Sequence, residues 1–148
     1  MWKLDCVKRM ATYGHITVDK DDEPSVTEKI QKILDSLGAV QGVEKALLVS
    51  EEGFPIMCAQ TTPISEEVET LVSAMVAGIV STFAGACVQL NLGKTIDYIH
   101  VQTPLGLGLI SSVGSTILVL ITKPKVKLGL MHYLITSTRT KMLKIRDF

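Results

Sequence analysis

The longest uncharged stretch of the sequence runs from Thr70 to Gly93, 24 residues without an acidic or basic side chain. Ser65 is a good N-cap before it, and the glutamates that follow Ser65 suit the positive end of a helix dipole. We therefore expect one helix from about Glu66 to Asn91, about 39 Å long. A helix of this length could span a membrane, but its many Gly, Ala, Ser and Thr residues favour a helix of a folded domain.

The two sides of this expected helix differ in bulk. One side carries large apolar residues, Val68, Val72, Met75, Ile79, Phe83 and Leu90, with Val76 and Val80 next to them. The opposite side carries small ones: Ala74, Gly78, Ser81 and Gly85. A solvent-facing side normally carries Lys and Glu, and neither side does. We expect the bulky side to pack on the protein's own sheet and the small side to meet a second copy; a central helix buried within a monomer is the alternative.

Two short apolar runs, residues 43–50 and 54–59, flank the sequence Glu51-Glu52-Gly53. This pattern predicts a hairpin in which Gly53 supplies the positive φ of a short loop. Neither run alternates between apolar and polar residues, as a strand with one wet face would. Helices should therefore cover both faces of the sheet to which the hairpin belongs.

The remaining elements complete a five-stranded sheet. A capping box of Ser25 and Glu28 opens a first helix, which Gly38 is expected to end in a left-handed conformation. Further strands are expected at 95–102, 105–113 and 116–122, and a last helix at 126–144. The residues of that helix expected to face inward are Leu130, Met131, Leu134, Ile135, Thr138 and Met142. The order α-β-β-α-β-β-β-α predicts an α/β protein of the α+β type, a five-stranded antiparallel sheet sandwiched by helices.

We expect one domain over residues 25–148, preceded by an N-terminal extension, residues 1–24. Trp2, Cys6 and Met10 have helical spacing, which indicates a short amphipathic helix followed by an acidic linker; a mobile tail is the alternative.

Charge is unevenly distributed, although the net charge is zero. Residues 1–69 carry 13 acids and 7 bases, whereas residues 70–148 carry 2 acids and 8 bases. Zero net charge argues against a nucleic-acid-binding protein held by phosphate contacts. The split predicts two faces of opposite sign, either solvated or used in docking. With 47% hydrophobic residues and a mean hydropathy of +0.33, some apolar surface should meet a partner or a membrane.

The three cysteines, Cys6, Cys58 and Cys87, are far apart and form no C-x-x-C pair. This favours buried thiols in a reducing compartment, so we expect a cytoplasmic protein. The N-terminus lacks the apolar core and cleavage site of a signal peptide.

Glycine-rich segments imitate two nucleotide-binding motifs without matching either. Gly93-Lys94-Thr95 ends like a P-loop, but Val88 stands where the first glycine belongs and a strand, not a helix, is expected to follow. Gly106 and Gly108 resemble a broken dinucleotide fingerprint, and more simply mark a close approach of another backbone to a strand.

No catalytic, cofactor-binding or metal-binding constellation is visible among the remaining polar residues. The histidines His15, His100 and His132 have no metal-like neighbours in the sequence. Glu51 and Glu52 lie at a turn, not in a cleft that would separate their pKa values. Lys123, Lys125 and Lys127 could touch an acidic partner or a lipid surface, and a solvated loop is the alternative. We expect a protein that is not an enzyme and needs no cofactor.

The order of the elements and several local patterns resemble the roadblock family of the dynein light chain type. The patterns are QGVEKALLVSEEGFPI, EEVETLVSAMVAGIVSTFAGACVQLNLG, and the strand ending ILVLIT that precedes KLGLMHYL. The resemblance covers residues 25–145. The layering is also that of profilin and longin folds, whose first helix and strand order fit less well. The first 24 residues and the few charges on the long helix depart from the family pattern.

This resemblance implies a non-enzymatic dimer, formed with a second copy or with another roadblock-like chain. In the family, two central helices pack antiparallel and two sheets join into one of ten strands. Such dimers bind small Ras-like GTPases, sometimes as their activating partners, or serve as structural subunits of motor or scaffold complexes without GTPase contact. Both functions stay open, as does peripheral membrane contact through a partner.

Carried over to this chain, the self-contact involves the small side of the long helix and the strand at 95–102. Its residues are Ala74, Gly78, Ser81, Gly85, Ile96, Tyr98 and His100. Candidate contacts for a further partner are Glu51, Glu52, Lys123 and Lys125.

Overall fold

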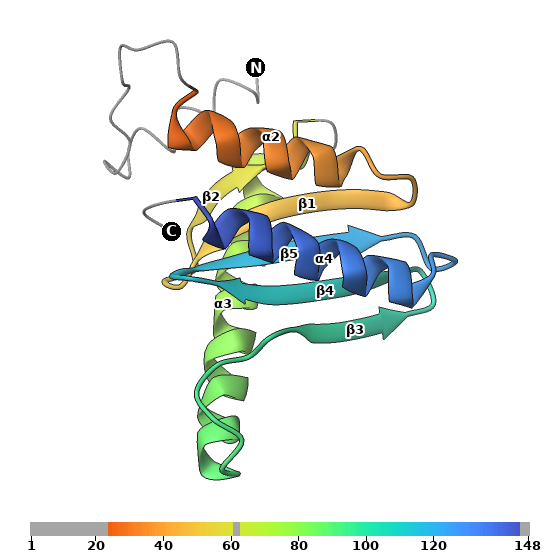
Figure 1. Ribbon diagram of the computed structural model, residues 1–148. Coiled ribbons are helices and arrows are strands. Elements are labelled where there is room, and N and C mark those ends of the chain that lie inside the picture. Colours follow the sequence, from red (N-terminus) through yellow and green to blue (C-terminus); the bar gives the residue numbers. More distant parts are fainter. Residues whose placement is uncertain (1–23, 61–62, 146–148) are drawn as a thin grey trace.

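The computed structural model describes residues 24–60 and 63–145 and contains the predicted order of elements (Figure 1). The helices are α2 (Val26–Gly38), α3 (Glu66–Gln89) and α4 (Leu128–Leu143). The strands are β1 (Val43–Ser50), β2 (Pro55–Cys58), β3 (Ile99–Thr103), β4 (Gly106–Val113) and β5 (Thr116–Thr122). Every neighbouring pair is antiparallel, in the order β2-β1-β5-β4-β3. The α+β prediction is confirmed. The predicted N-terminal helix, which includes Cys6, and the following His15 lie outside the described residues.

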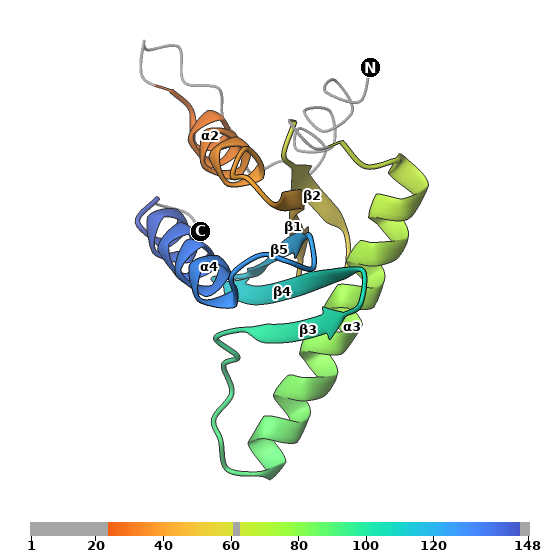
Figure 2. The same cartoon turned by 90° about the vertical axis from the view of Figure 1, so that its right-hand side faces the viewer.

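The sheet has helices on both faces, as the apolar hairpin predicts. Figure 2 shows α2 and α4 on one side of the sheet and α3 on the other. The α2/α4 side holds the larger core, in which Leu34, Leu118 and Met131 have no exposed surface. The α3 side holds a smaller core around Val49, Val76 and Val119. The central strands β1 and β5 are therefore apolar on both faces because each face packs against a different helix layer.

Helix α2 begins as its sequence predicts and ends one residue later than expected. The Ser25 hydroxyl accepts a hydrogen bond from the Glu28 amide, and the Glu28 carboxylate accepts one from the Ser25 amide, each at 3.3 Å. Gly38 is the last helical residue, and Ala39 follows in a right-handed conformation, so the predicted left-handed Gly38 is wrong. The left-handed residue is Gly42, at φ +95°, just before β1.

The β1–β2 hairpin turns through Ser50–Gly53 and touches α3. The Gly53 amide donates to the Ser50 carbonyl at 3.0 Å, and the predicted positive φ of Gly53 is present, at +95°. A Cβ on Gly53 would lie 3.2 Å from the Cα of Ala74. The glycine thus lets the turn pack directly against the helix backbone, while Glu51 and Glu52 remain exposed.

The predicted orientation of α3 is right for one part of the bulky side and wrong for the other. Val72, Val76 and Val80 pack on the sheet, whereas Met75 and Phe83 are 60% and 54% exposed. The close approach of the hairpin turn explains the difference, because it requires small residues such as Ala77 beneath it. Met75, Ile79 and Phe83 are consequently left uncovered among the described residues.

Strand β3 and helix α4 are shorter than predicted. Strand β3 starts at Ile99, so the expected strand residues 95–98 lie in the preceding loop. Within α4, the inward prediction holds for the buried Met131, Ile135, Thr138 and Met142. It fails for Leu130, which is 47% exposed.

Candidate functional site

Helix α3 exposes an apolar surface along most of its length. Met75, Ile79 and Phe83 follow one another at four-residue intervals and are 39–60% exposed, so they form one stripe. Other apolar residues of the same helix and its C-terminal end are also exposed: Val68, Leu71, Val88, Leu90 and Leu92. Contiguous exposed apolar area of this kind marks an interaction surface in a folded domain.

The C-terminal part of α3 extends beyond the sheet. Figures 1 and 2 show the helix crossing the strands and continuing past β3, the last strand of the sheet. Only 17% of its most apolar 18-residue stretch is buried, and by length and composition alone the helix could cross a membrane. No part of the described protomer covers this overhanging half, so its apolar surface is exposed.

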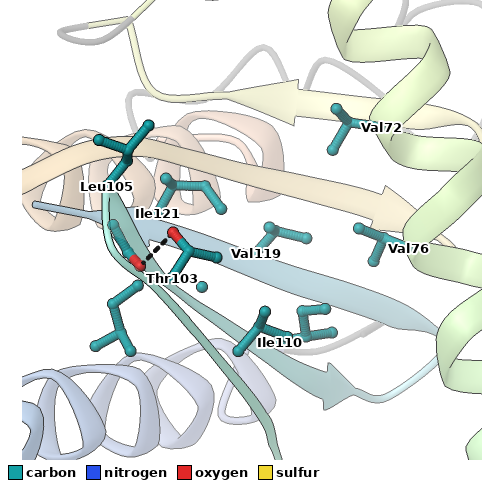
Figure 3. A pocket seen from close by; sticks show the side chains of 11 residues that line it. Val72, Val76, Thr103, Leu105, Ile110, Val119 and Ile121 are labelled. Atoms are coloured by element: carbon teal, nitrogen blue, oxygen red, sulfur yellow. Dashed lines mark hydrogen bonds between the residues drawn. The ribbon is translucent and has the colours of Figure 1, made fainter. Parts of the chain in front are cut away.

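Beside α3 lies an open groove of about 360 Å³, formed between the helix and strands β3, β4 and β5 (Figure 3). Val72 and Val76 line it from the helix, and Val101, Ile110 and Ile121 line it from the sheet. Met75 and Ile79 lie three residues after Val72 and Val76, so the exposed stripe borders the groove. The lining of the groove is almost wholly apolar. The hydroxyl of Thr103, which lines it, donates a hydrogen bond to the Gly106 carbonyl at 3.0 Å.

The two edges of the sheet differ in accessibility. At the β2 edge, the Gln31 side chain of α2 donates to the Cys58 carbonyl at 3.0 Å, and the Asp35 carboxylate accepts from the Gln60 amide at 2.7 Å. Strand β3 pairs with β4 on one side and has no strand on its other side among the described residues. An unpaired strand edge is a template for another strand, so β3 is the edge open to sheet extension.

The small side of α3 is accessible for most of its length. Apart from the nearby backbone of α3 itself, no atom of residues 24–60 and 63–145 comes within 4 Å of the place where a Cβ would stand on Gly78 or Gly85. Ala74, in contrast, lies against Gly53 of the same protomer. The small side therefore begins inside an intramolecular contact and becomes open toward the C-terminus of the helix.

The residues predicted around β3 split between a loop and the strand. Ile96 and Tyr98 lie in the loop before β3, and the Tyr98 ring lies against that of His132 in a tilted arrangement. His100 lies in β3, opposite Leu109 of β4, and its Nε2 is buried without a hydrogen-bond partner among residues 24–60 and 63–145.

The candidate contacts for a further partner are exposed but far apart in the fold. Glu51 and Glu52 follow the last residue of β1, and Lys123 follows Thr122, which pairs with the first residue of β1. The acidic and the basic residues therefore lie at opposite ends of the sheet and do not form one site.

Within the described ranges, no group of three or more His, Cys, Asp or Glu side chains is placed to hold a metal ion. The close approach expected at the glycine pair is present at Gly106, where a Cβ would stand 2.8 Å from the Thr122 carbonyl oxygen. Gly106 therefore lets β4 approach β5 closely, whereas a Cβ on Gly108 would make only ordinary contacts, the nearest at 3.7 Å.

The model of the Roadblock/LC7 domain matches residues 29–122. The chain belongs to the Roadblock/LC7 family. Three solved structures share the roadblock fold of this chain, all at identities that establish the fold alone. MglB of Myxococcus xanthus is 24% identical, with a TM-score of 0.72, over 87% of this chain and 93% of that one. Gliding protein MglB of Thermus thermophilus is 18% identical, with a TM-score of 0.73, over 90% and 96%.

The third structure, described as MglB with a tetrameric arrangement, is 17% identical to this roadblock chain. It has a TM-score of 0.72 over 90% of this chain and 96% of that one. A comparison with curated protein sequences gives no match.

Sequence reasoning missed the groove of this roadblock domain. Val101, Ile110 and Ile121 are far apart in the sequence and meet only through the strand order β5-β4-β3. One signal was available: the absence of charge on every side of the long helix indicates that both the sheet and something else must cover it.

Proposed function

We propose that this roadblock protein is a non-enzymatic, homodimeric scaffold of the cytoplasm that binds a small Ras-like GTPase. The observation that carries the dimer is the overhanging, uncharged α3 beside an open groove and an open sheet edge. The GTPase is supported by membership of the Roadblock/LC7 family, whose dimers provide platforms for such partners.

A two-fold axis beside β3 would cover the overhanging half of α3 and pair the open edge of β3 at the same time. Pairing the β3 edges of two copies places the overhanging half of each α3 above the partner's sheet. That is the side of the sheet where the groove lies, next to Val101 and Ile110. Each groove would then receive the partner's helix, in an isologous contact that closes on itself.

The exposed stripe Met75–Ile79–Phe83 is the side of α3 that borders the groove. We therefore assign the centre of the self-contact to this bulky side, and not to the small side favoured by the sequence pattern. Neither side carries a charge between Thr70 and Gly93, so antiparallel pairing brings no like charges together. A self-associated MglB structure, described as tetrameric, is consistent with a fold that joins its own copies.

The dimer is tested by light scattering of the full chain at micromolar concentration. We expect twice the 16.1 kDa of one chain. Phe83→Glu should reduce the mass to that of a monomer, because an uncompensated carboxylate would be buried against the partner. Ser36→Glu, which adds the same charge to an exposed position of α2, should leave the dimer intact. A monomeric wild-type chain would contradict the dimer.

The GTPase partner is tested by affinity purification of the tagged full chain from its native cell, followed by mass spectrometry. We expect a small GTPase to co-purify, and the purified pair to rebind in one nucleotide state more strongly than in the other. Recovery of scaffold chains without any GTPase would instead support a structural subunit. The Phe83→Glu variant serves as a control, because loss of the GTPase with this variant would show that binding requires the dimer.

A further inference from the structure

A second exposed apolar surface lies on α4, on the sheet face opposite α3. Tyr133 is 67% exposed, Leu130 is 47% exposed and Leu128 is 46% exposed. Leu130 and Tyr133, three residues apart, lie on one side of α4, away from the buried Met131 and Ile135. Leu128 is exposed as the first residue of the helix. We call Leu130 and Tyr133, together with Leu128 at the start of the helix, the α4 outer face. The proposed dimer does not use it, because the groove and the overhanging helix lie on the other side of the sheet.

Lysines border the α4 outer face at both ends. Lys123, Lys125 and Lys127 are exposed in the connection that leads into α4, and Lys141 and Lys144 are exposed at its C-terminal end. Between residues 98 and 145 the chain has six basic residues and no acidic one. The sixth base, Arg139, is turned toward Asp97, whose carboxylate accepts its hydrogen bond at 3.3 Å. The charge around the outer face is therefore uniformly positive and entirely lysine.

The neighbouring helix in the same layer does not oppose this charge. Helix α2 carries two acids, Glu28 and Asp35, and two bases, Lys29 and Lys32. Asp35 accepts hydrogen bonds from Gln31 and Gln60, so its carboxylate is engaged within the fold. The charges of α2 cancel, so the layer formed by α2 and α4 has a positive net charge that comes from α4.

We propose that the α4 outer face is a docking surface for a membrane that contains anionic lipids. Protein interfaces are enriched in arginine and depleted in lysine, whereas lysines attract an anionic lipid surface as mobile point charges. Tyrosine and leucine on a helix that lies flat suit the headgroup boundary, where apolar side chains enter and the phenol stays hydrated. The composition of this face thus fits lipid better than an acidic protein.

The face belongs to a single protomer, so the inference stands without the dimer. In the proposed dimer, a two-fold axis perpendicular to the sheet would place both α4 helices on the same side. Two equivalent faces would then point at one plane, and membrane binding would gain avidity from the second copy.

The test is co-sedimentation of the full chain with large vesicles of phosphatidylcholine, with or without about one third phosphatidylserine. We expect binding that requires phosphatidylserine and weakens at high salt. Lys125→Gln should weaken it about fivefold, the effect of one lysine near an anionic surface. Tyr133→Ser should weaken it severalfold at an exposed position that tolerates the change. Lys94→Gln, an exposed lysine beyond α3, is the matched control and should have little effect.

Three results would overturn the proposal. One is a wild-type chain that does not sediment with phosphatidylserine vesicles. Another is binding that Lys125→Gln and Tyr133→Ser leave unchanged, which would place the membrane contact elsewhere in the chain. The third is an equal loss of vesicle binding with Lys94→Gln and Lys125→Gln. It would indicate that any exposed lysine attracts the anionic vesicle, without a defined binding face. Phe83→Glu separates this proposal from the dimer, because a monomer should still bind, at reduced avidity.

Discussion

The ring of Tyr98 lies 4.3 Å from the ring of His132, inclined to it by 58°. The residue before it, Asp97, accepts hydrogen bonds from the Ser111 hydroxyl, at its carbonyl, and from Arg139, at its carboxylate. The segment that leads into β3 is thus fastened to both β4 and α4. This explains why the residues predicted to extend β3 lie outside the strand.

Replacing Tyr98 should loosen this attachment. Tyr98→Ala is expected to lower the free energy of unfolding by about 1 kcal/mol through the lost ring contact, and to speed amide exchange at the start of β3. Tyr133→Ala removes the same ring from a position that is 67% exposed and is the control. Chemical unfolding with hydrogen exchange compares the two; equal losses would argue against a special role for the Tyr98 ring.

A methyl group at Gly53 should disturb the contact between hairpin and helix. Gly53 and Gly93 have nearly the same φ, +95° and +97°, but only Gly53 has a neighbour, the Ala74 Cα at 3.2 Å from an added Cβ. Each Gly→Ala change should lower the free energy of unfolding by about 1–2 kcal/mol, because alanine disfavours the left-handed backbone. Gly53→Ala should lower it by about 1 kcal/mol more, because the turn must move away from α3. Urea unfolding of both variants measures the difference, and its absence would mean that the turn relaxes freely.

The two glycines of β4 should respond differently to alanine. A Cβ on Gly106 would stand 2.8 Å from the Thr122 carbonyl oxygen, whereas one on Gly108 would meet its nearest atom at 3.7 Å. Gly106→Ala is therefore expected to destabilise the fold by about 1–3 kcal/mol. Gly108→Ala should be neutral or slightly stabilising, because its contact is ordinary. Thermal unfolding distinguishes them, and a tolerated Gly106→Ala would show that β4 and β5 can separate at this end.

Removing the Asp35 carboxylate should open the β2 edge. Asp35→Ala leaves the Gln60 amide without the acceptor it now has at 2.7 Å, and is expected to cost about 1–2 kcal/mol. Exchange of the Gln60 amide should accelerate more than that of core strand amides. Ser36→Ala, whose hydroxyl only bonds back to the Lys32 carbonyl, is the neighbouring control. Unchanged protection of Gln60 would contradict the assigned role of Asp35.

Gly78→Leu locates the self-contact on α3. The place of its Cβ is empty within 4 Å, so the protomer should fold and gain some helix stability. With the self-contact on the bulky side, light scattering should still report a dimer for Gly78→Leu and a monomer for Phe83→Glu. The reverse pair of results would return the contact to the small side that the sequence pattern favoured.

The sequence predicted the helices and strands well, but it predicted poorly which side of the central helix packs on the sheet. The reason is physical. Amphipathic helices such as α2 reveal their buried side, because Lys29 and Lys32 mark the wet one. Helix α3 has no charged side between Thr70 and Gly93, so the prediction relied on side-chain size. It placed Val72 correctly on the sheet but Met75 and Phe83 wrongly. What decides its orientation is the hairpin turn at Gly53, a contact between residues distant in the sequence.

The sequence predicted that the long helix carries an apolar contact surface, but it did not predict where on the fold this surface and its groove lie. The missing charges on α3 indicate apolar surface that the sheet does not cover, and the stripe Met75–Ile79–Phe83 is exposed in this way. The groove could not be anticipated, because Val76, Val101 and Ile121 come together only once the strand order is known.

Gln31 donates a hydrogen bond to Cys58 and Asp35 accepts one from Gln60 at the end of β2, and both would make growth of the sheet one-sided. In two copies that join through β3, both β3 edges would be paired. The sheet of the dimer would then end on each side at β2, whose edge groups are already hydrogen-bonded to α2. A third copy would find no strand to extend. The same two side chains that hold α2 to the hairpin would therefore act as a stop against fibre formation, so that edge pairing ends at a closed particle instead of an open polymer.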